Sequence, residues 1–529
     1  GGNLAATATT GNMTDSGALT IAGTSSFTTS ANNATITLNT TTNAFAGAVT
    51  ITTNDDSGTD ADVTIDGGTT ALILAASTID GDLNVRSGNA SGITDSGTLT
   101  VGGNLAATTD ANNGLINLGT LAVDGTIQLT TNGSGNATVV NDRSFYLRNA
   151  AVGGNLSATA TTGFIQDIGT LTVSGTSSFT TSANNAYINL NGANALTGAV
   201  SLNTTGSSGY ATVDNGTTAL NIAASSVGGN LTLTSGNASG ITDSGTVTVG
   251  GWLRATTDAN NGVINLGTLA VDGTVALVTN GSGNATVVND AGLTFAASTV
   301  GGNLAATATT GNMTDSGTVT VGGNLAATTD ANNGVINLGT LAVDGSVSLH
   351  THGSGNATVV NDAGLNFAAS TVGGALNATA TTGNVTDSGA LTIAGTSSFT
   401  TSANNADIAL DTTTNAFTGA VTITTNDNSG TDADVTIDGG TTALVLAAST
   451  IDGDLMLRSG HASGITDSGT VTVGGDFAAI TDANNGVINM GTLAVDGIIA
   501  LVTNGSGNAT VVNDAGLNFA ASTVGGALN

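Results

Sequence analysis

The 529-residue sequence predicts an all-β protein, a right-handed parallel β-helix (β-solenoid) with three short strands per coil. The first observation is a short phrase that returns at intervals of roughly 21–34 residues, which is the signature of stacked repeats. The second is composition, because Thr, Val, Asn, Asp and Gly dominate and Lys, Glu and Pro are absent, which favours strands and turns over helices. The intervals are unequal and are not all multiples of six, which disfavours a left-handed hexapeptide helix.

The phrase consists of an apolar residue, a small or acidic residue, Gly, any residue and a second apolar residue. Anchored on its Gly, the phrase occurs 22 times, so we expect about 21 coils of roughly 21–34 residues. The residue two positions before the Gly is Val, Ile, Leu or Phe wherever it can be tested, and the residue two positions after is usually large and apolar. Side chains two apart share one face of a strand, so these side chains should point inward.

Successive units differ in length in a fixed order, and six units make one long repeat. The long repeats cover residues 1–152, 153–300, 301–372 and 373–524, the third being truncated, and the next one starts at 525–529. No composition shift or proline-rich linker interrupts the pattern. Residues 1–529 are therefore expected to form a single continuous β-solenoid that is a window of a longer repeat array.

The unit 103–124 shows how one coil is expected to fold. Strands are predicted at 104–108, 115–118 and 121–123, with Asn and Gly residues in the bends between them. The longer units are expected to keep the three strands and to enlarge one turn. The core side chains expected from this coil and the start of the next are Leu105, Ile116, Leu118, Leu121, Val123 and Ile127.

Two sets of polar residues are expected to form ladders along the solenoid. The Asn-Asn turns, such as Asn112-Asn113 and Asn260-Asn261, recur at equivalent positions in successive units. Asp95 and Asn117 each lie at the same distance before an anchoring Gly, which predicts a carboxylate stacked beside an amide in the next coil. The structural interpretation of both sets is preferred to a catalytic or ligand-binding one.

Two acidic turns could hold a metal ion. Oxygen-rich loops suit Ca²⁺, which takes six to eight oxygen ligands. The matching turn of the second long repeat keeps only Asp214, so a solvated turn without metal is the preferred alternative. No other cofactor is expected. The candidate ligands are Asp55, Asp56, Asp60, Asp62 and Asp66 in the first turn and Asp427, Asp432, Asp434 and Asp438 in the second.

The formal net charge of −31 comes from 36 acidic and five basic residues. Nucleic acid is therefore an unfavourable partner, since phosphate binding needs a basic surface. No apolar run approaches the length of about 20 residues that a membrane-spanning helix needs, so membrane insertion is not expected either. The expected partner is the protein itself, through axial or lateral association into a fibre, and other cells or glycans are the alternative.

Phrases such as ITDSGTVTVGGNLAATT and DSGALTIAGTSSFTT resemble the repeats of very large secreted bacterial proteins of the filamentous haemagglutinin type and of related autotransporter passengers. The resemblance covers the whole chain. It implies a right-handed β-helical shaft on the outside of a bacterial cell. It does not imply an activity, because such repeats occur in adhesins, matrix proteins and toxin shafts.

Three functions compete on this basis. The favoured one is a structural shaft of an extracellular surface fibre or matrix filament, which is rigid because its coils stack on an apolar core. The alternative is an adhesin whose repeated outer turns bind cells or glycans. A polysaccharide-active β-helix enzyme is a distant third, since catalysis needs a singular set of convergent groups and nearly every carboxylate here is repeated. We therefore expect no enzymatic activity.

Overall fold

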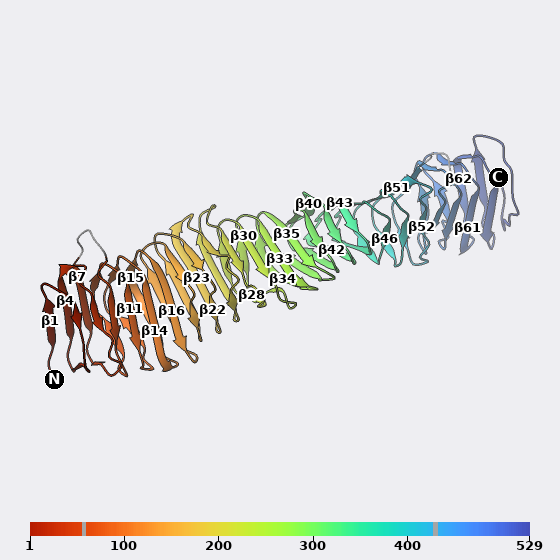
Figure 1. Cartoon of the computed structure of the whole chain (residues 1–529). Coiled ribbons are helices and arrows are strands. Elements are labelled where there is room, and N and C mark those ends of the chain that lie inside the picture. Colours follow the sequence, from red (N-terminus) through yellow and green to blue (C-terminus); the bar gives the residue numbers. More distant parts are fainter. Residues whose placement is uncertain (55–59, 427–431) are drawn as a thin grey trace. The chain divides into compact units, whose positions relative to one another are not determined.

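The computed structural model describes residues 1–54, 60–426 and 432–529. The protein is all-β, and its short parallel strands stack as a β-solenoid (Figure 1). Two compact units are distinguished, Gly1–Gly273 and Thr274–Asn529, and each is such a stack. The single continuous solenoid remains a prediction. The described ranges contain no helix long and apolar enough to cross a membrane.

Each coil has a straight side and a bent side. In unit 1 the straight side of one coil is β14 (Leu105–Asn112), which pairs in parallel with β11 (Leu83–Ser87) and β16 (Thr126–Asn132). The bent side is β15 (Ile116–Val123), and the preceding coil forms it from two strands, β12 (Ile93–Asp95) and β13 (Leu99–Val101). The three strands expected per coil are therefore present, with the second and third joined in β15.

The longer of the 21–34-residue repeat units contain an extra straight strand, not an enlarged turn. After β16 the chain forms β17 (Ala137–Asn141), which pairs with β15 on one side and with β20 (Leu156–Ala160) on the other. The straight strands that follow Gly125 and Gly154 thus lie on opposite faces of the solenoid. Each long unit adds about half a coil, so the chain makes about 24 turns, more than the 21 expected from counting phrases.

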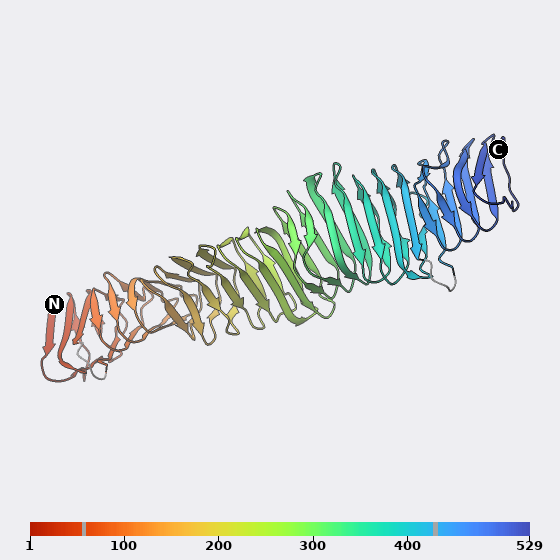
Figure 2. The same cartoon turned by 90° about the horizontal axis from the view of Figure 1, so that it is seen from above.

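The extra strands occur at matching places in every long repeat. They are β8 (Val63–Asp66), β17 and β27 (Ala211–Asp214) in unit 1 and β36 (Ala285–Asn289), β45 (Ala357–Asn361), β55 (Val435–Asp438) and β64 (Ala509–Asn513) in unit 2. At each one the straight and bent sides exchange faces. The stacked strands of the two faces can be followed in Figure 2.

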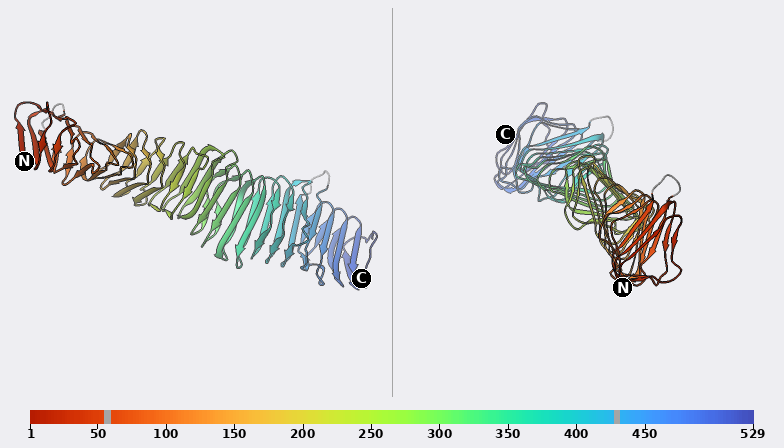
Figure 3. Two further views of the ribbon diagram at one scale, coloured as in Figure 1. Left: turned by 90° about the horizontal axis from the view of Figure 1, so that it is seen from below. Right: turned by 90° about the vertical axis from the view of Figure 1, so that its left-hand side faces the viewer.

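The core is a stack of inward side chains from consecutive coils. Leu83, Leu105 and Ile127 lie in register on β11, β14 and β16, and each is at most 1% exposed. The other expected core residues of this coil are also at most 1% exposed, namely Ile116, Leu118, Leu121 and Val123. Burial of such aliphatic side chains contributes roughly 1.5–3 kcal/mol each, so the apolar columns dominate the stability of a coil. The coils of unit 1 are seen nearly end-on in Figure 3.

The tight turns depend on left-handed backbone conformations. The second Asn of each Asn-Asn pair has a φ between 60° and 65°, a conformation that Asn tolerates better than most residues. Gly464 has a φ of 67°, and a Cβ there would meet the backbone oxygen of Val487. Glycine is therefore required at that turn. The Asn residues are Asn33, Asn113, Asn185, Asn261, Asn333, Asn405 and Asn485.

Candidate functional site

One polar column runs beside the first strand residue of successive coils. In unit 2 the Oδ1 atom of Asp407 accepts the backbone N–H of Asp434 (3.0 Å), and Asp434 accepts from Asp454 in the same way (2.9 Å). Asp454 accepts from Asp476 (2.7 Å), which in turn accepts from Ile498 (2.8 Å). Four carboxylates therefore add a hydrogen bond between coils outside the strand ladders.

Unit 1 contains the same kind of column with more neutral residues. Asp62 accepts the N–H of Asp82 at 2.8 Å, Asp82 accepts that of Asn104 at 2.7 Å, and Asn104 accepts that of Thr126 at 2.8 Å. The short side-chain oxygen reaches the backbone of the next coil because the coils stack in register. This role is not among those predicted from the sequence, and the sequence signal for it is the recurrent Asn or Asp directly after the anchoring Gly.

The expected pairing of Asp95 with Asn117 is wrong. Asn117 pairs with Thr94, the residue before Asp95. The reason is that the bend between Thr94 and Leu99 is one residue longer than the bend between their partners, Asn117 and Leu121. Asp95 accepts the backbone N–H groups of Gly119 (3.0 Å) and Thr120 (2.6 Å) and the Thr120 hydroxyl (2.7 Å). The carboxylate therefore caps the bend of the next coil.

The Asn-Asn turns make side-chain bonds between coils, as expected of ladders. The Asn113 side-chain oxygen accepts both the backbone N–H and the hydroxyl of Ser134, each at 2.8 Å. Asn112 lies in register with Asn132, and a direct amide pair joins Asn54 to Asn32 at 2.7 Å. Asn260 ends β33 (Leu253–Asn260), and Asn261 follows with the left-handed φ of the turn.

A fully buried Asn completes the strand ladder where the faces exchange. Asn361 ends β45 and is 1% exposed. Its side-chain oxygen accepts the N–H of Val343 (2.8 Å), and its Nδ2 donates to the carbonyls of Val343 (3.0 Å) and Gly364 (2.7 Å). Asn141 contacts Val123 in the same way in unit 1. The side-chain amide of Asn361 thus acts as a peptide group would and pairs with both the N–H and the carbonyl of Val343.

The two acidic turns are described only in part. Asp55, Asp56 and Asp427 lie outside the described residues. Asp60, Asp62, Asp432 and Asp434 are exposed, whereas Asp66 and Asp438 are buried at the opposite ends of β8 and β55. The described residues include no group of three or more His, Asp or Glu side chains placed to hold a metal ion. The calcium site stays a prediction.

Two carboxylates, one buried and one half-buried, bind backbone and amide groups of the next coil. Asp167 is 4% exposed and accepts the Asn194 amide at 2.8 Å and the Gly192 N–H at 3.0 Å. Burial raises the pKa of Asp167 above its ordinary value, and the hydrogen bonds from Asn194 and Gly192 offset only part of that effect. Burial likewise raises the pKa of Asp387, which binds Asn415 in unit 2.

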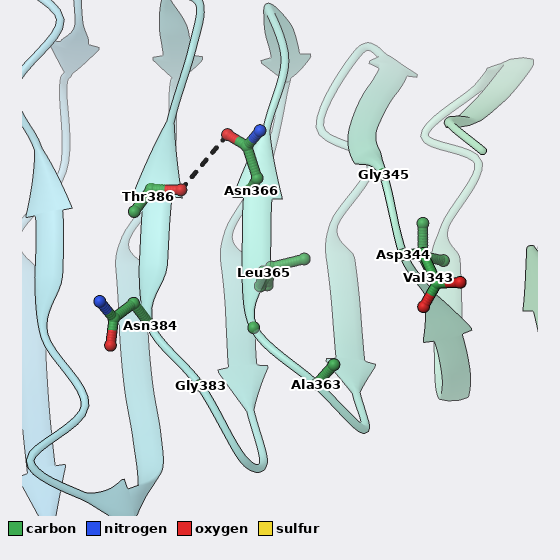
Figure 4. A pocket seen from close by; sticks show the side chains of 10 residues that line it. Val343, Asp344, Gly345, Ala363, Leu365, Asn366, Gly383, Asn384 and Thr386 are labelled. Carbon is green, nitrogen blue, oxygen red and sulfur yellow. Dashed lines mark hydrogen bonds between the residues drawn. The ribbon is translucent and has the colours of Figure 1, made fainter. Parts of the chain in front are cut away.

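A surface hollow of about 500 Å³ opens at one exchange of faces in unit 2. It lies beside β46 (Leu365–Phe367) and β49 (Val385–Asp387), with Asp344, Asn366 and Asn384 around it (Figure 4). The Thr386 hydroxyl donates to Asn366 at 3.3 Å across its floor. The hollow is open, its lining is polar and apolar in similar measure, and its lining residues form no convergent set of acid, base and nucleophile.

The matching place in unit 1 is filled by larger side chains. Tyr146 stands where unit 2 has Asn366, and Phe164 stands where it has Asn384. Their rings meet edge to face with centroids 5.4 Å apart. Arg143 replaces Ala363 and forms ion pairs with Asp124 and Asp142.

From Phe164 an aromatic row continues along the same outer surface of unit 1. Tyr187 stacks on Phe164 with centroids 4.7 Å apart and ring planes within 4°, and Tyr210 stacks on Tyr187 at 4.9 Å and 7°. Burial raises the pKa of Tyr187, and the neighbouring tyrosines act in the same direction. Two coils further, Trp252 continues the row. We call Phe164, Ile168, Tyr187, Tyr210 and Trp252 the aromatic face.

The comparisons with known proteins concern repeats and give no activity. No curated protein and no solved structure matches this chain. One family model, described as repeats of unknown function (DUF5649), matches residues 1–52, 60–120, 134–203, 282–350, 354–424 and 432–502. These segments cover most of the sequence and include parts of each long repeat. The chain belongs to the DUF5649 family of repeats, and it is a β-solenoid repeat protein.

Proposed function

We propose that the protein is a structural shaft of an extracellular fibre or matrix filament on a bacterial surface. The observation that carries the proposal is the double linkage between coils. Parallel strand ladders join each coil to the next, and columns such as Asp407, Asp434 and Asp454 add side-chain bonds along the same direction. Such an array gains stability from each nearest-neighbour interface, which suits a load-bearing rod.

The composition and the resemblance support an extracellular location, which is part of the same proposal. The repeat phrases resemble those of secreted filamentous haemagglutinin-type proteins, and export by that type of route would place the shaft outside the cell. An acidic chain with few basic residues also offers few cleavage points to trypsin-like proteases. Surface exposure is therefore part of the proposal.

Deletion of residues 301–372 tests the shaft. The deletion joins Val300 to Gly373, which copies the native junction Val372–Gly373 and removes about 3.5 coils. A shaft should shorten by roughly 17 Å per chain, at about 4.8 Å per coil, and should still form surface filaments. Electron microscopy of native cells with gold-labelled antibodies against the chain measures both outcomes.

Two results would contradict the shaft. One is a chain that antibodies find only inside the cell. The other is loss of all filaments from a deletion variant that circular dichroism shows to be folded. Deletion of residues 301–361 is the control. It joins Val300 to Asp362 in a sequence context that does not occur in the native chain, so the coils on either side should not stack in register and filaments should not form.

An adhesin is the second candidate, and the aromatic face favours it. Exposed aromatic side chains grouped on one surface mark an interaction site. In that case attachment to cells or glycans should fall when the aromatic face is changed, while filaments of normal length persist.

A further inference from the structure

The aromatic face lies on one outer surface of unit 1, and its aromatic residues differ from the residues at the equivalent positions of the other long repeats. Tyr187 stands where the fourth long repeat has Asp407, Tyr210 where it has Asp434, and Trp252 where it has Asp476. The same positions in the other repeats otherwise hold Asn, Thr, Val or Asp. Substitutions that belong to different coils, far apart in the sequence, therefore meet on one surface.

The register places these side chains in one column. Ile165, Ile188, Ala211, Leu231 and Leu253 are aligned from coil to coil, and the column consists of the residues directly before them. Phe164, Tyr187 and Tyr210 occupy three successive places, Asn230 the next, and Trp252 the one after. Ile168 lies on the same outward side of β21 (Ile165–Ile168).

The surface is apolar and exposed. Among the described residues of unit 1, the large hydrophobic side chains that are clearly exposed are Ile168 (43%), Tyr210 (37%) and Trp252 (42%). All three belong to the aromatic face. Grouped exposure of this kind is unusual for a surface that meets only water.

The surrounding charge differs from that of the rest of the chain. Arg148 and Arg254 are exposed beside the aromatic face, and no ion pair of either is found in the described ranges. The equivalent positions hold Ala296 and Ala478. Of the four carboxylates in the matching column of unit 2, three are replaced by uncharged rings and the fourth, Asp454, by Asn230, so this column carries no negative charge.

We propose that the aromatic face is a contact surface for a second copy of this chain. Two copies of a protein with a formal net charge of −31 repel each other over most orientations. The repulsion is smallest where the acidic column is interrupted and two Arg side chains flank apolar rings. A two-fold arrangement would place the aromatic face of one copy on that of the other and bring Arg148 and Arg254 within reach of acidic residues nearby.

The ring geometry favours a protein surface over a sugar. Sugars bind aromatic side chains through the flat faces of the rings. Phe164 and Tyr187 cover each other's faces and offer mainly their edges, and Ile168 offers only aliphatic surface. Edges and aliphatic groups pack well against similar groups of a second copy.

The size of the surface sets the expected strength. The column spans four coil spacings of ~4.8 Å, and the outward positions of a strand cover a width of roughly 15 Å. The contact would bury about 300 Å² on each copy, which is smaller than a stable specific interface and fits a weak, transient association. We therefore expect a dimer with a Kd of roughly 10 μM. This inference deepens the proposed function and rests on it, because a weak lateral contact becomes useful when many shafts lie side by side.

The experiment is sedimentation equilibrium of the full chain between about 1 and 100 μM. The test variant is Tyr187→Asp with Tyr210→Asp, because the chain itself carries Asp at both matching positions, Asp407 and Asp434. The control variant, Ser226→Asp with Thr248→Asp, adds the same charge at exposed positions on the opposite sheet. Trp252→Asn, which copies Asn104, tests the contact without added charge and serves if the double variant does not fold.

The expected result is a dimer whose Kd rises at least roughly tenfold in the test variant and stays within about twofold in the control. A chain that is monomeric throughout the range would overturn the inference. Equal weakening by the test and control variants would overturn it too, because repulsion without a specific surface explains that result. A monomer that binds a glycan array through Tyr187 and Tyr210 would assign the aromatic face to carbohydrate instead. The shaft could survive each of these failures, since filament length and location are measured separately.

Discussion

Replacement of the buried Asn361 by Ala tests whether a side-chain amide completes the strand ladder in unit 2. The substitution removes one acceptor for the N–H of Val343 and two donors, to the carbonyls of Val343 and Gly364. Asn361 is only 1% exposed, so those backbone groups would lose their partners in the interior. Leaving a buried polar group unpaired costs about 1–3 kcal/mol, and partial hydration lowers the sum. We expect a loss of about 3 kcal/mol in the free energy of local opening.

Hydrogen exchange of the Val343 amide is the appropriate assay, because stacked coils open locally and a single unfolding free energy is not well defined for them. A loss of about 3 kcal/mol corresponds to exchange that is roughly a hundredfold faster. The matched control is Asn377→Ala, an exposed Asn on β48 (Leu376–Ala380), which should change exchange little. Asn361→Asp keeps the acceptor but loses both donors, so it should be at least as disruptive. Unchanged protection of Val343 in Asn361→Ala would refute the reasoning.

Three further predictions follow from the turns and the polar caps. Gly464→Ala forces a left-handed φ on Ala and drives its Cβ into the backbone oxygen of Val487. The coils around β59 (Ile465–Asp467) should therefore lose protection from hydrogen exchange by more than the roughly 1 kcal/mol that the unfavourable φ alone costs. In the same experiment Gly339→Ala, which has no atom near its Cβ position, should be tolerated. Asp315→Ala removes the cap on the N–H groups of Gly339 (3.0 Å) and Thr340 (2.7 Å), so both amides should exchange faster, whereas Asp315→Asn should retain part of the protection. Burial raises the folded-state pKa of Asp167, so the folded protein binds the carboxyl proton more tightly than the unfolded chain does, and stability should fall as pH rises from the ordinary carboxyl pKa to the raised one. Acidification from about pH 7 to pH 4 should therefore slow exchange of the Gly192 amide, after correction for the intrinsic rate. This slowing should be missing in Asp167→Asn.

Several elements of the fold follow from local patterns in the sequence. The apolar residues two before and two after each anchoring Gly predict which side chains point inward, and Leu105 and Ile127 do lie in register in the core. Strand alternation explains this success, because a residue's side is decided by its neighbours in the chain. The positive φ at Asn113 follows from the same local chemistry of an Asn-Asn turn.

The contacts between coils could not be obtained in this way. The pairing predicted for Asp95 assumed that equal distances from Gly103 and Gly125 imply adjacency, whereas a one-residue difference in the bend places Thr94 beside Asn117. The sequence likewise predicts an enlarged turn where the structure has the extra strand β17. Both depend on how many residues each coil uses to close, which is decided by packing against the coils on either side.

The solenoid class, the inward side chains and the residues suited to the turns can be predicted from the sequence, because they depend on strand alternation and backbone preference over a few positions. Three features emerge only from the stacked coils: the number of coils, the exchange of faces at strands such as β17 and β45, and the partners of buried groups such as Asn361. Only the stacked coils bring Phe164, Tyr187 and Tyr210 together on one surface. Register between coils depends on how each whole coil closes against its neighbours, and no short stretch of sequence contains that information.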